Sequence, residues 1–321
     1  MSSPRRLMFA ALSTLVLVAA AACSSSSATP TAPAAPGQST AASAAANPTD
    51  ASSLISQALS GGADIKSFHI KVTVGGSISA AAMQAATDDS TATALTLDGT
   101  SLEGDVDIAN GAAHLAVNVP AIAQLGGVPI AADLIVVDQA LYAKTALLGS
   151  DQYMMLDLSS LSSMAGALPI PSIPVAMPSA GASSDLSAVT GEVAQLQQQL
   201  QAAGAKATVV GTEQIGGENA THVNVTVPVD WINQQITASE ASATDTPPPG
   251  LVGAKLDSAT FDVWVYQSNN DLAQIHLTAT SSVVGNIDFM LTLTNIDQPV
   301  TISAPPANEI SSANPFSGLL P

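Results

Sequence analysis

Four histidines, His69, His114, His222 and His276, are the side chains best suited to acid–base or metal chemistry in this sequence of 321 residues. Each lies one position out of step with the alternating apolar residues of a predicted strand, so each is expected to point away from the core. They fall on different strands and lack the short, regular spacing of zinc ligands. We therefore interpret them as solvated strand residues and predict no metal site.

The motifs of the common catalytic sites are also missing from the sequence. It contains no G-x-S-x-G elbow, no H-E-x-x-H motif, no glycine-rich phosphate loop and no Cys–His pair. Asp88 and Asp89 fall in a predicted turn, and Asp105 and Asp107 fall on a polar strand face, where they favour solubility. We predict no catalytic residue and no cofactor, and interpret the chain as not an enzyme. A hydrolase with an unrecognised site is the weakest alternative.

The single cysteine, Cys23, is where the sequence does predict covalent chemistry. Residues 1–6 carry two arginines and no acid, and residues 7–22 are almost entirely apolar. This run is short for a membrane span of about 20 residues and close to the hydrophobic region of a signal peptide. It resembles the bacterial lipoprotein box, in which the cysteine becomes the acylated N-terminus, although Ala20 stands where Leu is usual. The alternative is an ordinary secretory signal with Cys23 incidental.

The charge of the exported chain excludes several partners. Removing residues 1–22 takes away two of the seven basic residues and none of the 25 acidic ones, so the net charge changes from −18 to −20. That sign opposes nucleic acid and anionic lipid headgroups, which both require Lys and Arg. We therefore expect the protein to be attached to the membrane through the acylated Cys23 alone. Stable anchoring requires two or more acyl chains.

Composition also divides the chain into segments. Residues 24–49 are nearly all Ser, Thr, Ala or Pro, which predicts a disordered tether after the signal peptide 1–22 and the acylated Cys23. Residues 50–310 are expected to form one domain, and residues 311–321 a C-terminal tail. With one cysteine, no internal disulfide can stabilise the domain.

The domain alternates between strand and helix patterns. A helix is predicted at residues 50–60 and another, short one after Asp230, and a third helix is predicted from residues 183–185 to Gly204. Residues with a period of two predict roughly ten strands joined by turns, including a last strand at 300–303. This pattern predicts an α+β fold with an antiparallel sheet whose single apolar face is covered by helices. Trp264 and Tyr266 share one strand face, which we expect a loop or helix to cover partly.

Residues 158–184 interrupt the pattern, because four prolines exclude a regular helix or a central strand. The segment is nevertheless too apolar for an ordinary surface loop. We interpret six of its residues as the mouth of an apolar cavity, with a fixed cover over one sheet edge as the alternative. The six are Met164, Leu168, Ile170, Ile173, Val175 and Met177.

Several segments resemble the LppX/LprA/LprF/LprG family of envelope lipoproteins. The similarity includes the cysteine start and the segments IKSFHIKVTV, VVDQALYAK, GTEQIGGENATHVNVTV, FDVWVYQSNNDLAQIHL and DQPVTISAPPANEI. Their order and spacing carry the match, whereas residues 161–184 and the proline-rich 245–250 depart from it. The resemblance implies the LolA/LolB-like fold: a curved antiparallel half-barrel with helices on its concave face, enclosing an apolar cavity for multi-acyl lipids or lipoglycans.

These expectations combine into one functional hypothesis. The chain is expected to be anchored on the extracytoplasmic face of the cell membrane and to carry an acyl lipid or lipoglycan across the envelope as a monomer, with a lipid exporter or an acceptor protein as a further partner. The alternative is a non-carrier envelope lipoprotein with a solid core that binds a protein. The residues expected to line the cavity are Ile70, Val72, Val74, Leu115, Val117, Val119, Val223, Val225, Phe289 and Leu291.

Overall fold

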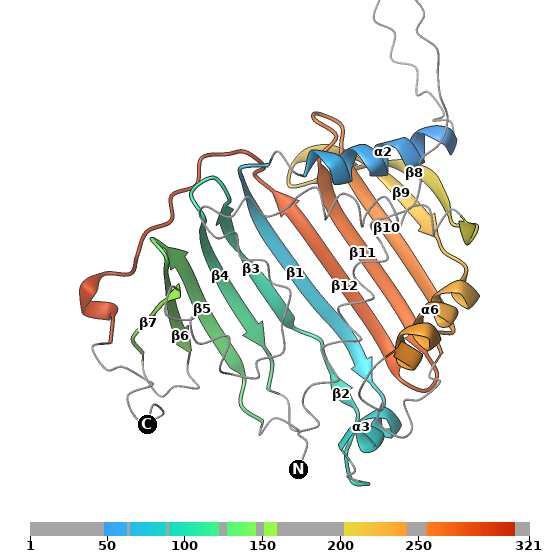
Figure 1. Cartoon of the computed structure of the whole chain (residues 1–321), viewed down its shortest axis with the longest axis horizontal. Helices are drawn as coiled ribbons and strands as arrows, with labels where there is room; N and C mark the ends of the chain where they lie inside the picture. Colours follow the sequence, from blue (N-terminus) through green and yellow to red (C-terminus); the bar gives the residue numbers. More distant parts are fainter. Residues whose placement is uncertain are drawn as a thin grey trace, which may run out of the picture.

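A computed structural model describes residues 48–62, 65–87, 90–121, 127–145, 151–158, 202–242 and 255–311. These residues form one twelve-stranded antiparallel sheet in the order β7-β6-β5-β4-β3-β1-β12-β11-β10-β9-β8, with β2 paired to β1 outside that path. The two outermost strands, β7 and β8, do not pair with each other, so the sheet is open and is not a closed barrel (Figure 1). The predicted α+β class with an open, half-barrel type of sheet is therefore confirmed.

The described residues contain twelve strands, three α-helices and one 3₁₀ turn. The strands are β1 (Ser67–Ile78), β2 (Leu95–Thr96), β3 (Thr100–Asp107), β4 (Ala112–Val119), β5 (Ile130–Val137), β6 (Ala140–Thr145), β7 (Met154–Asp157), β8 (Lys206–Ile215), β9 (Glu218–Thr226), β10 (Ser258–Tyr266), β11 (Leu272–Ser281) and β12 (Gly285–Thr294). The helices are α2 (Pro48–Gly61), α3 (Ala80–Thr87), α6 (Val229–Ser242) and the 3₁₀ turn η4 (Ala307–Glu309).

Two meanders make up the sheet. We call β1 and β3–β7 the N-terminal meander and β8–β12 the C-terminal meander. Within each, members that follow one another in the chain are neighbours in the sheet. Most are joined by short connections, but α3 and β2 lie between β1 and β3, and α6 lies between β9 and β10. In the described part of the chain the two meanders pair with each other where β1 meets β12, along a register that runs from His69 opposite Thr294 to Ile78 opposite Gly285.

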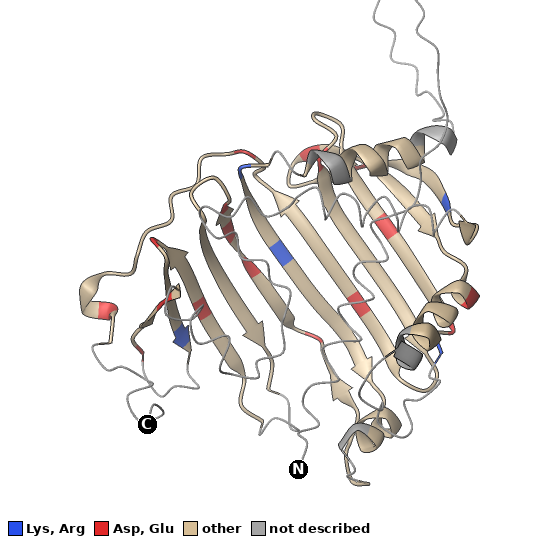
Figure 2. Cartoon of the chain, viewed as in Figure 1, with Lys and Arg blue, Asp and Glu red and all other residues tan. Residues whose placement is uncertain are grey.

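The period-two patterns of the strands combine into one apolar face, because directly opposed residues of neighbouring strands share a face. One register row crosses ten strands from β8 to β6 and contains no charged residue. It consists of Val209, Val223, Val263, Ile275, Leu291, Val72, Leu102, Val117, Ala132 and Thr145. We call this side of the sheet the apolar face and the opposite side, which carries the charged strand residues marked in Figure 2, the polar face.

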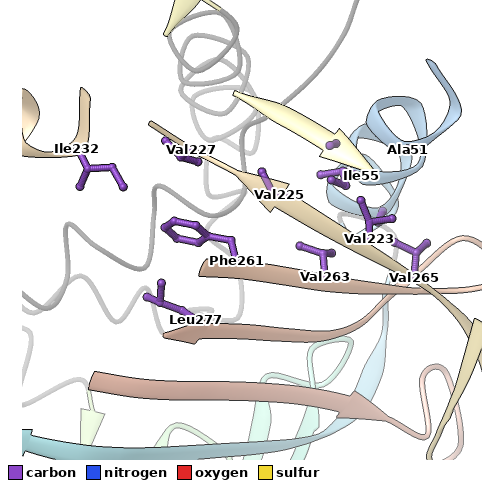
Figure 3. Packing of buried hydrophobic residues seen from close by; sticks show 12 residues of the cluster. Ala51, Ile55, Val223, Val225, Val227, Ile232, Phe261, Val263, Val265 and Leu277 are labelled. Carbon is purple, nitrogen blue, oxygen red and sulfur yellow. The ribbon is translucent and has the colours of Figure 1, made fainter. Parts of the chain in front are cut away.

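Two helices cover one part of the apolar face. Helix α2 crosses β8–β11 near one end of the strands, and α6 lies near the other end (Figure 1). Ile55 of α2 and Ile232 of α6 belong to the same buried cluster as Phe261 and Leu277 of the sheet, and Figure 3 shows these side chains between the layers. The main hydrophobic core of the described residues therefore lies under α2 and α6.

Residues in positive-φ conformations occur in several of the hairpin turns. Two features of the secondary structure differ from the sequence prediction. Gly111, Gly216 and Asn270 have positive φ values of 64°, 60° and 64° in the hairpin turns that the sequence predicted. Helix α3 was not predicted, because its run of alanines has no clear apolar stripe. The predicted strand at 300–303 is wrong, since this segment has no regular structure.

Several predictions concern residues outside the described part of the chain. They include the signal peptide 1–22, Cys23, the tether up to residue 47, the six residues of the proposed mouth, and nearly all of the predicted helix at 183–204. The proline-rich segment 245–250 and residues 312–321 also lie outside it.

Candidate functional site

All ten residues predicted to line a cavity lie on the apolar face. Val72 is opposite Leu291 and Leu102, and Leu102 is opposite Val117, so these side chains from β12, β1, β3 and β4 are direct neighbours. Val74 is opposite Phe289 in the next row. Alternation along each strand was enough to place these residues on one face, because the side-chain period of a strand is two.

Burial separates the ten residues into two groups. Val223 and Val225 on β9 are 0% and 1% exposed and belong to the cluster under α2 and α6. The eight others are half-buried: Ile70, Val72, Val74, Leu115, Val117, Val119, Phe289 and Leu291. Apart from Phe289, which packs at the margin of that cluster, none of these eight is part of it.

The half-buried group defines the candidate site. We call the apolar-face side chains of β1, β3, β4 and β12 the open apolar surface. Among the described residues, the cluster that α2 and α6 form with the sheet draws strand members from β8–β12 and none from β1 or β3–β7. The N-terminal meander therefore presents a row of Val, Ile and Leu side chains that these two helices do not cover.

Glycine shapes the middle of this surface. Gly104 on β3 lies directly between Ile70 and Leu115. A Cβ atom built on Gly104 would lie 1.9 Å from the backbone oxygen of His114. No residue other than glycine therefore fits at this position without a backbone shift. Glycines inside strands mark places where backbones approach closely or the sheet bends. The sequence contains this glycine, but nothing in the alternation pattern reveals the close approach.

The polar face holds all four histidines, as the alternation predicted, and each contacts a carboxylate on a neighbouring strand. The nitrogen–oxygen distances are 2.8 Å for His69 Nδ1 to Asp105, 2.7 Å for His114 Nε2 to Asp133, 2.9 Å for His222 Nε2 to Asp262 and 3.1 Å for His276 Nε2 to Asp288. The sequence did not predict these pairs, because they depend on cross-strand register. No group of three or more His, Cys, Asp or Glu side chains arranged to hold a metal ion occurs in the described ranges.

Other charged groups of the polar face are also paired across strands. Lys71 Nζ lies 3.1 Å from Glu103, and the hydrogen bond and charge of Lys71 lower the pKa of the Glu103 carboxyl. Tyr153 donates its hydroxyl to Asp133 over 2.7 Å. Burial first, and then Asp133, raises the pKa of Tyr153 to about 12. The four histidines, Lys71 and Tyr153 therefore each pair with a carboxylate on this face.

The aromatic residues of β10 belong to this network. Trp264 stacks on the His222 ring with 4.3 Å between centroids, and its Nε1–H donates to Glu213 over 3.0 Å. Trp264 and Tyr266 are 6% and 4% exposed and pack against Ile215 and Ile296. The prediction was that a loop or helix partly covers these two aromatics; Ile296, in the turn after β12, does so together with Ile215 of β8.

Residues 298–311, the C-terminal segment, cover another part of the polar face. Ile302 and Ile310 pack on a buried cluster of Ile135, Tyr142 and Tyr153. Two shallow pockets of about 230 and 540 Å³ lie beside this segment, and both are lined by Thr301–Ala304 together with polar-face residues or nearby turns. Neither pocket involves the open apolar surface, so an enclosed cavity there stays a prediction.

Helix length bears on membrane attachment. None of the helices within the described ranges is both long and apolar enough to cross a bilayer.

The geometry thus defines an open antiparallel sheet with one continuous apolar face, half of it packed under two helices. No protein-family model matches the chain, and no curated protein sequence matches it. Among solved structures, the chain is similar to LprF from Mycobacterium bovis, with 18% identity over 80% of this chain and 97% of that chain and a TM-score of 0.41.

Two further solved structures show the same kind of likeness. The lipoprotein LppX from Mycobacterium tuberculosis is 17% identical over 78% of this chain and 97% of that chain, with a TM-score of 0.36. MucB is 12% identical over 82% of this chain and 63% of that chain, with a TM-score of 0.28. LprF and LppX are members of the family that the sequence resembles.

Proposed function

We propose that this chain is a membrane-anchored envelope lipoprotein that binds an acylated lipid or lipoglycan on the open apolar surface and carries it across the cell envelope. The observation that supports this most is the continuity of the apolar face. The register row that is buried under the helices on β9 and β10 continues, still aliphatic, across β1, β3 and β4. Large apolar surfaces of this kind usually mark binding sites.

The chemistry of the surface favours hydrocarbon chains over a protein partner. Most of its side chains are Val, Ile and Leu, with two aromatics, Phe68 and Phe289, and one hydroxyl, that of Thr100. The centres of protein–protein interfaces are enriched in Tyr, Trp, Phe, Met and Arg, and of these residue types the surface contains Phe alone. Branched aliphatic side chains offer a smooth apolar surface without hydrogen-bond donors, which suits acyl chains. A protein-binding lipoprotein with a solid core is the competing function.

A solvent extract of the purified protein tests the proposal. The full-length chain with Cys23→Ser, which lacks the proposed acylation site, would be purified without detergent and its extract analysed by mass spectrometry. We expect an acyl lipid in stoichiometric amount. If no lipid co-purifies and added lipid does not bind, the carrier function is wrong and the protein-binding alternative gains support.

The anchor is a separate part of the proposal. Because the mature chain carries a charge of −20, its attachment to an anionic membrane should depend on the acyl chains of Cys23. We expect Cys23→Ser to be exported and folded but recovered in the soluble fraction after cell lysis. Equal retention of wild type and Cys23→Ser on membranes after a high-salt wash would contradict the anchor.

The mouth of the site is proposed to include the apolar residues of 164–177. Replacing Ile170, Ile173 and Val175 together by serine should lower lipid occupancy with little change in thermal stability if these residues gate the site. If they form a fixed cover, each buried aliphatic group is worth roughly 1.5–3 kcal/mol, and the melting temperature should fall as well. Unchanged lipid occupancy in the triple variant would rule out the gate.

A further inference from the structure

A single hydroxyl interrupts the open apolar surface. Thr100, the first residue of β3, lies directly opposite Val74, and Val74 lies opposite Phe289. On the other side, Val119 follows Asn118, which is the partner of Ser101. Thr100 therefore occupies a position on the apolar face whose cross-strand neighbours are valines.

The Thr100 hydroxyl has no partner. Its Oγ1 atom is buried, and in the part of the chain that the structure describes it is the one buried side-chain nitrogen or oxygen without a hydrogen bond. The backbone of the same residue is satisfied, because its N–H donates to the Leu97 oxygen over 3.1 Å. A buried hydroxyl without a partner is unfavourable, whereas valine has nearly the same shape and would fit this row without that cost.

We propose that Thr100 is a positioning residue for the lipid and that its Oγ1–H donates a hydrogen bond to an ester carbonyl of the bound acyl chain. This inference rests on the proposed function. The hydrocarbon part of a lipid offers no acceptor to a hydroxyl on an apolar surface, but the ester carbonyl lies directly at the end of the acyl chain. It is therefore the polar group best placed to reach a hydroxyl that is surrounded by valines.

The position of Thr100 in the sheet also sets a direction for the lipid. Thr100 follows the Asp98–Gly99 turn, and both turn residues are exposed. Val72, Leu102 and Val117 lie in the register row on the inner side of Thr100. An ester carbonyl bound at Thr100 would place the acyl chain along that row and the headgroup beyond the turn, in water. The geometry thus predicts an ester-linked lipid with a solvent-facing headgroup.

A pair of lipids that differ only in the carbonyl tests this inference. The probes are dioleoylphosphatidylcholine and its dialkyl ether analogue, which keeps the headgroup and the chain length but has no ester carbonyl. Binding to the full-length chain with Cys23→Ser would be compared with binding to the same chain carrying Thr100→Val, Thr100→Ser or, as a control on the polar side of β1, Thr73→Val.

We expect Thr100→Val to weaken diester binding about three- to tenfold, the range of one neutral hydrogen bond. Diether binding should not change, Thr100→Ser should keep most of the diester affinity, and Thr73→Val should change neither. The melting temperature of lipid-free Thr100→Val should be equal to or higher than that of the parent chain, because the substitution removes an unpaired buried hydroxyl.

Three results would overturn the inference. They are unchanged diester binding by Thr100→Val, an equal loss for both lipids, or a lower melting temperature of the lipid-free variant, which would assign the hydroxyl to a partner within the protein. Failure of both lipids to bind the parent chain would instead contradict the proposed function, and the inference about Thr100 would then also be wrong.

Discussion

The two meanders of the sheet have the same alternating strand pattern, but the side chains on their apolar faces differ in burial. On the C-terminal meander, Val225, Phe261 and Leu277 are each 1% exposed under α2 and α6. On the N-terminal meander, Val72, Leu102 and Val117, which lie in the neighbouring register row, are half-buried, and the cluster under the two helices does not include them. The C-terminal meander therefore forms a packed core, and the N-terminal meander extends the same surface beyond it.

On the polar side both meanders have a small buried cluster, and that of the C-terminal meander includes Trp264 and Tyr266. Ile302 and Ile310 of the C-terminal segment cover Ile135, Tyr142 and Tyr153 of the N-terminal meander. That meander consequently has its own small core, away from the open apolar surface. Its strands can be held in place from the polar side, and α2 and α6 do not include its apolar side in their cluster.

The largest expected difference between the meanders is in stability. Leu277→Ala should lower the free energy of unfolding by about 2–5 kcal/mol, because it leaves a cavity in a closed core. Leu115→Ala on the N-terminal meander should cost about 1 kcal/mol, since a half-buried side chain loses only part of its transfer free energy. Urea unfolding of lipid-free protein measures both. Equal losses would mean that the N-terminal meander is packed as tightly as the C-terminal one.

A smaller difference is expected for an isosteric pair. Val225→Thr places a hydroxyl in the closed core, where an unsatisfied group costs about 1–3 kcal/mol. Val117→Thr places the same hydroxyl on the open apolar surface, where it should cost well under that and should reduce lipid occupancy instead. Thermal unfolding and lipid mass spectrometry on the two variants check the comparison. The reverse ranking in stability would contradict it.

The smallest effect should come from the ion pair between Lys71 and Glu103 on the polar face of the N-terminal meander. The pKa of Glu103 is lowered by Lys71, so this pair stabilises the fold above the ordinary carboxyl value of 4.5 and loses its effect as the pH falls below it. Glu103 is about half exposed, so Lys71→Met should cost no more than about 0.2–1 kcal/mol at pH 7. The difference between wild type and variant should shrink as the pH falls through the lowered pKa of Glu103, and a difference that does not shrink would assign Lys71 another role.

Much of this fold follows from local patterns. The alternation in Phe68, Ile70 and Val72 fixes which residues share a face, and turn signals such as Asn110–Gly111 fix which strands are neighbours. The pairing of β1 with β12 was not predicted, because strands more than 200 residues apart carry no local signal of their register. Residues 300–303 alternate like a strand but pack across the polar face without regular structure, where Ile302 has a partner.

The candidate site was predictable only in part. Alternation placed all ten predicted residues on the apolar face, but it did not distinguish Val223 and Val225, which are covered by helices, from the half-buried group. That distinction depends on where α2 and α6 pack, which is tertiary information. The unpaired hydroxyl of Thr100 was missed for a similar reason, since threonine is common in strands and only the register shows which groups surround it.

Photocrosslinking tests the central claim, that the open apolar surface holds the lipid, most directly. A phosphatidylcholine with a diazirine near the end of one acyl chain would be bound to the full-length chain with Cys23→Ser, irradiated, and the modified residues identified by peptide mass spectrometry. We predict labelling of the apolar-face residues of β1, β3, β4 and β12, such as Val72, Leu102 and Val117. Labelling confined to α2, β9 and β10, or to the polar face, would contradict the account.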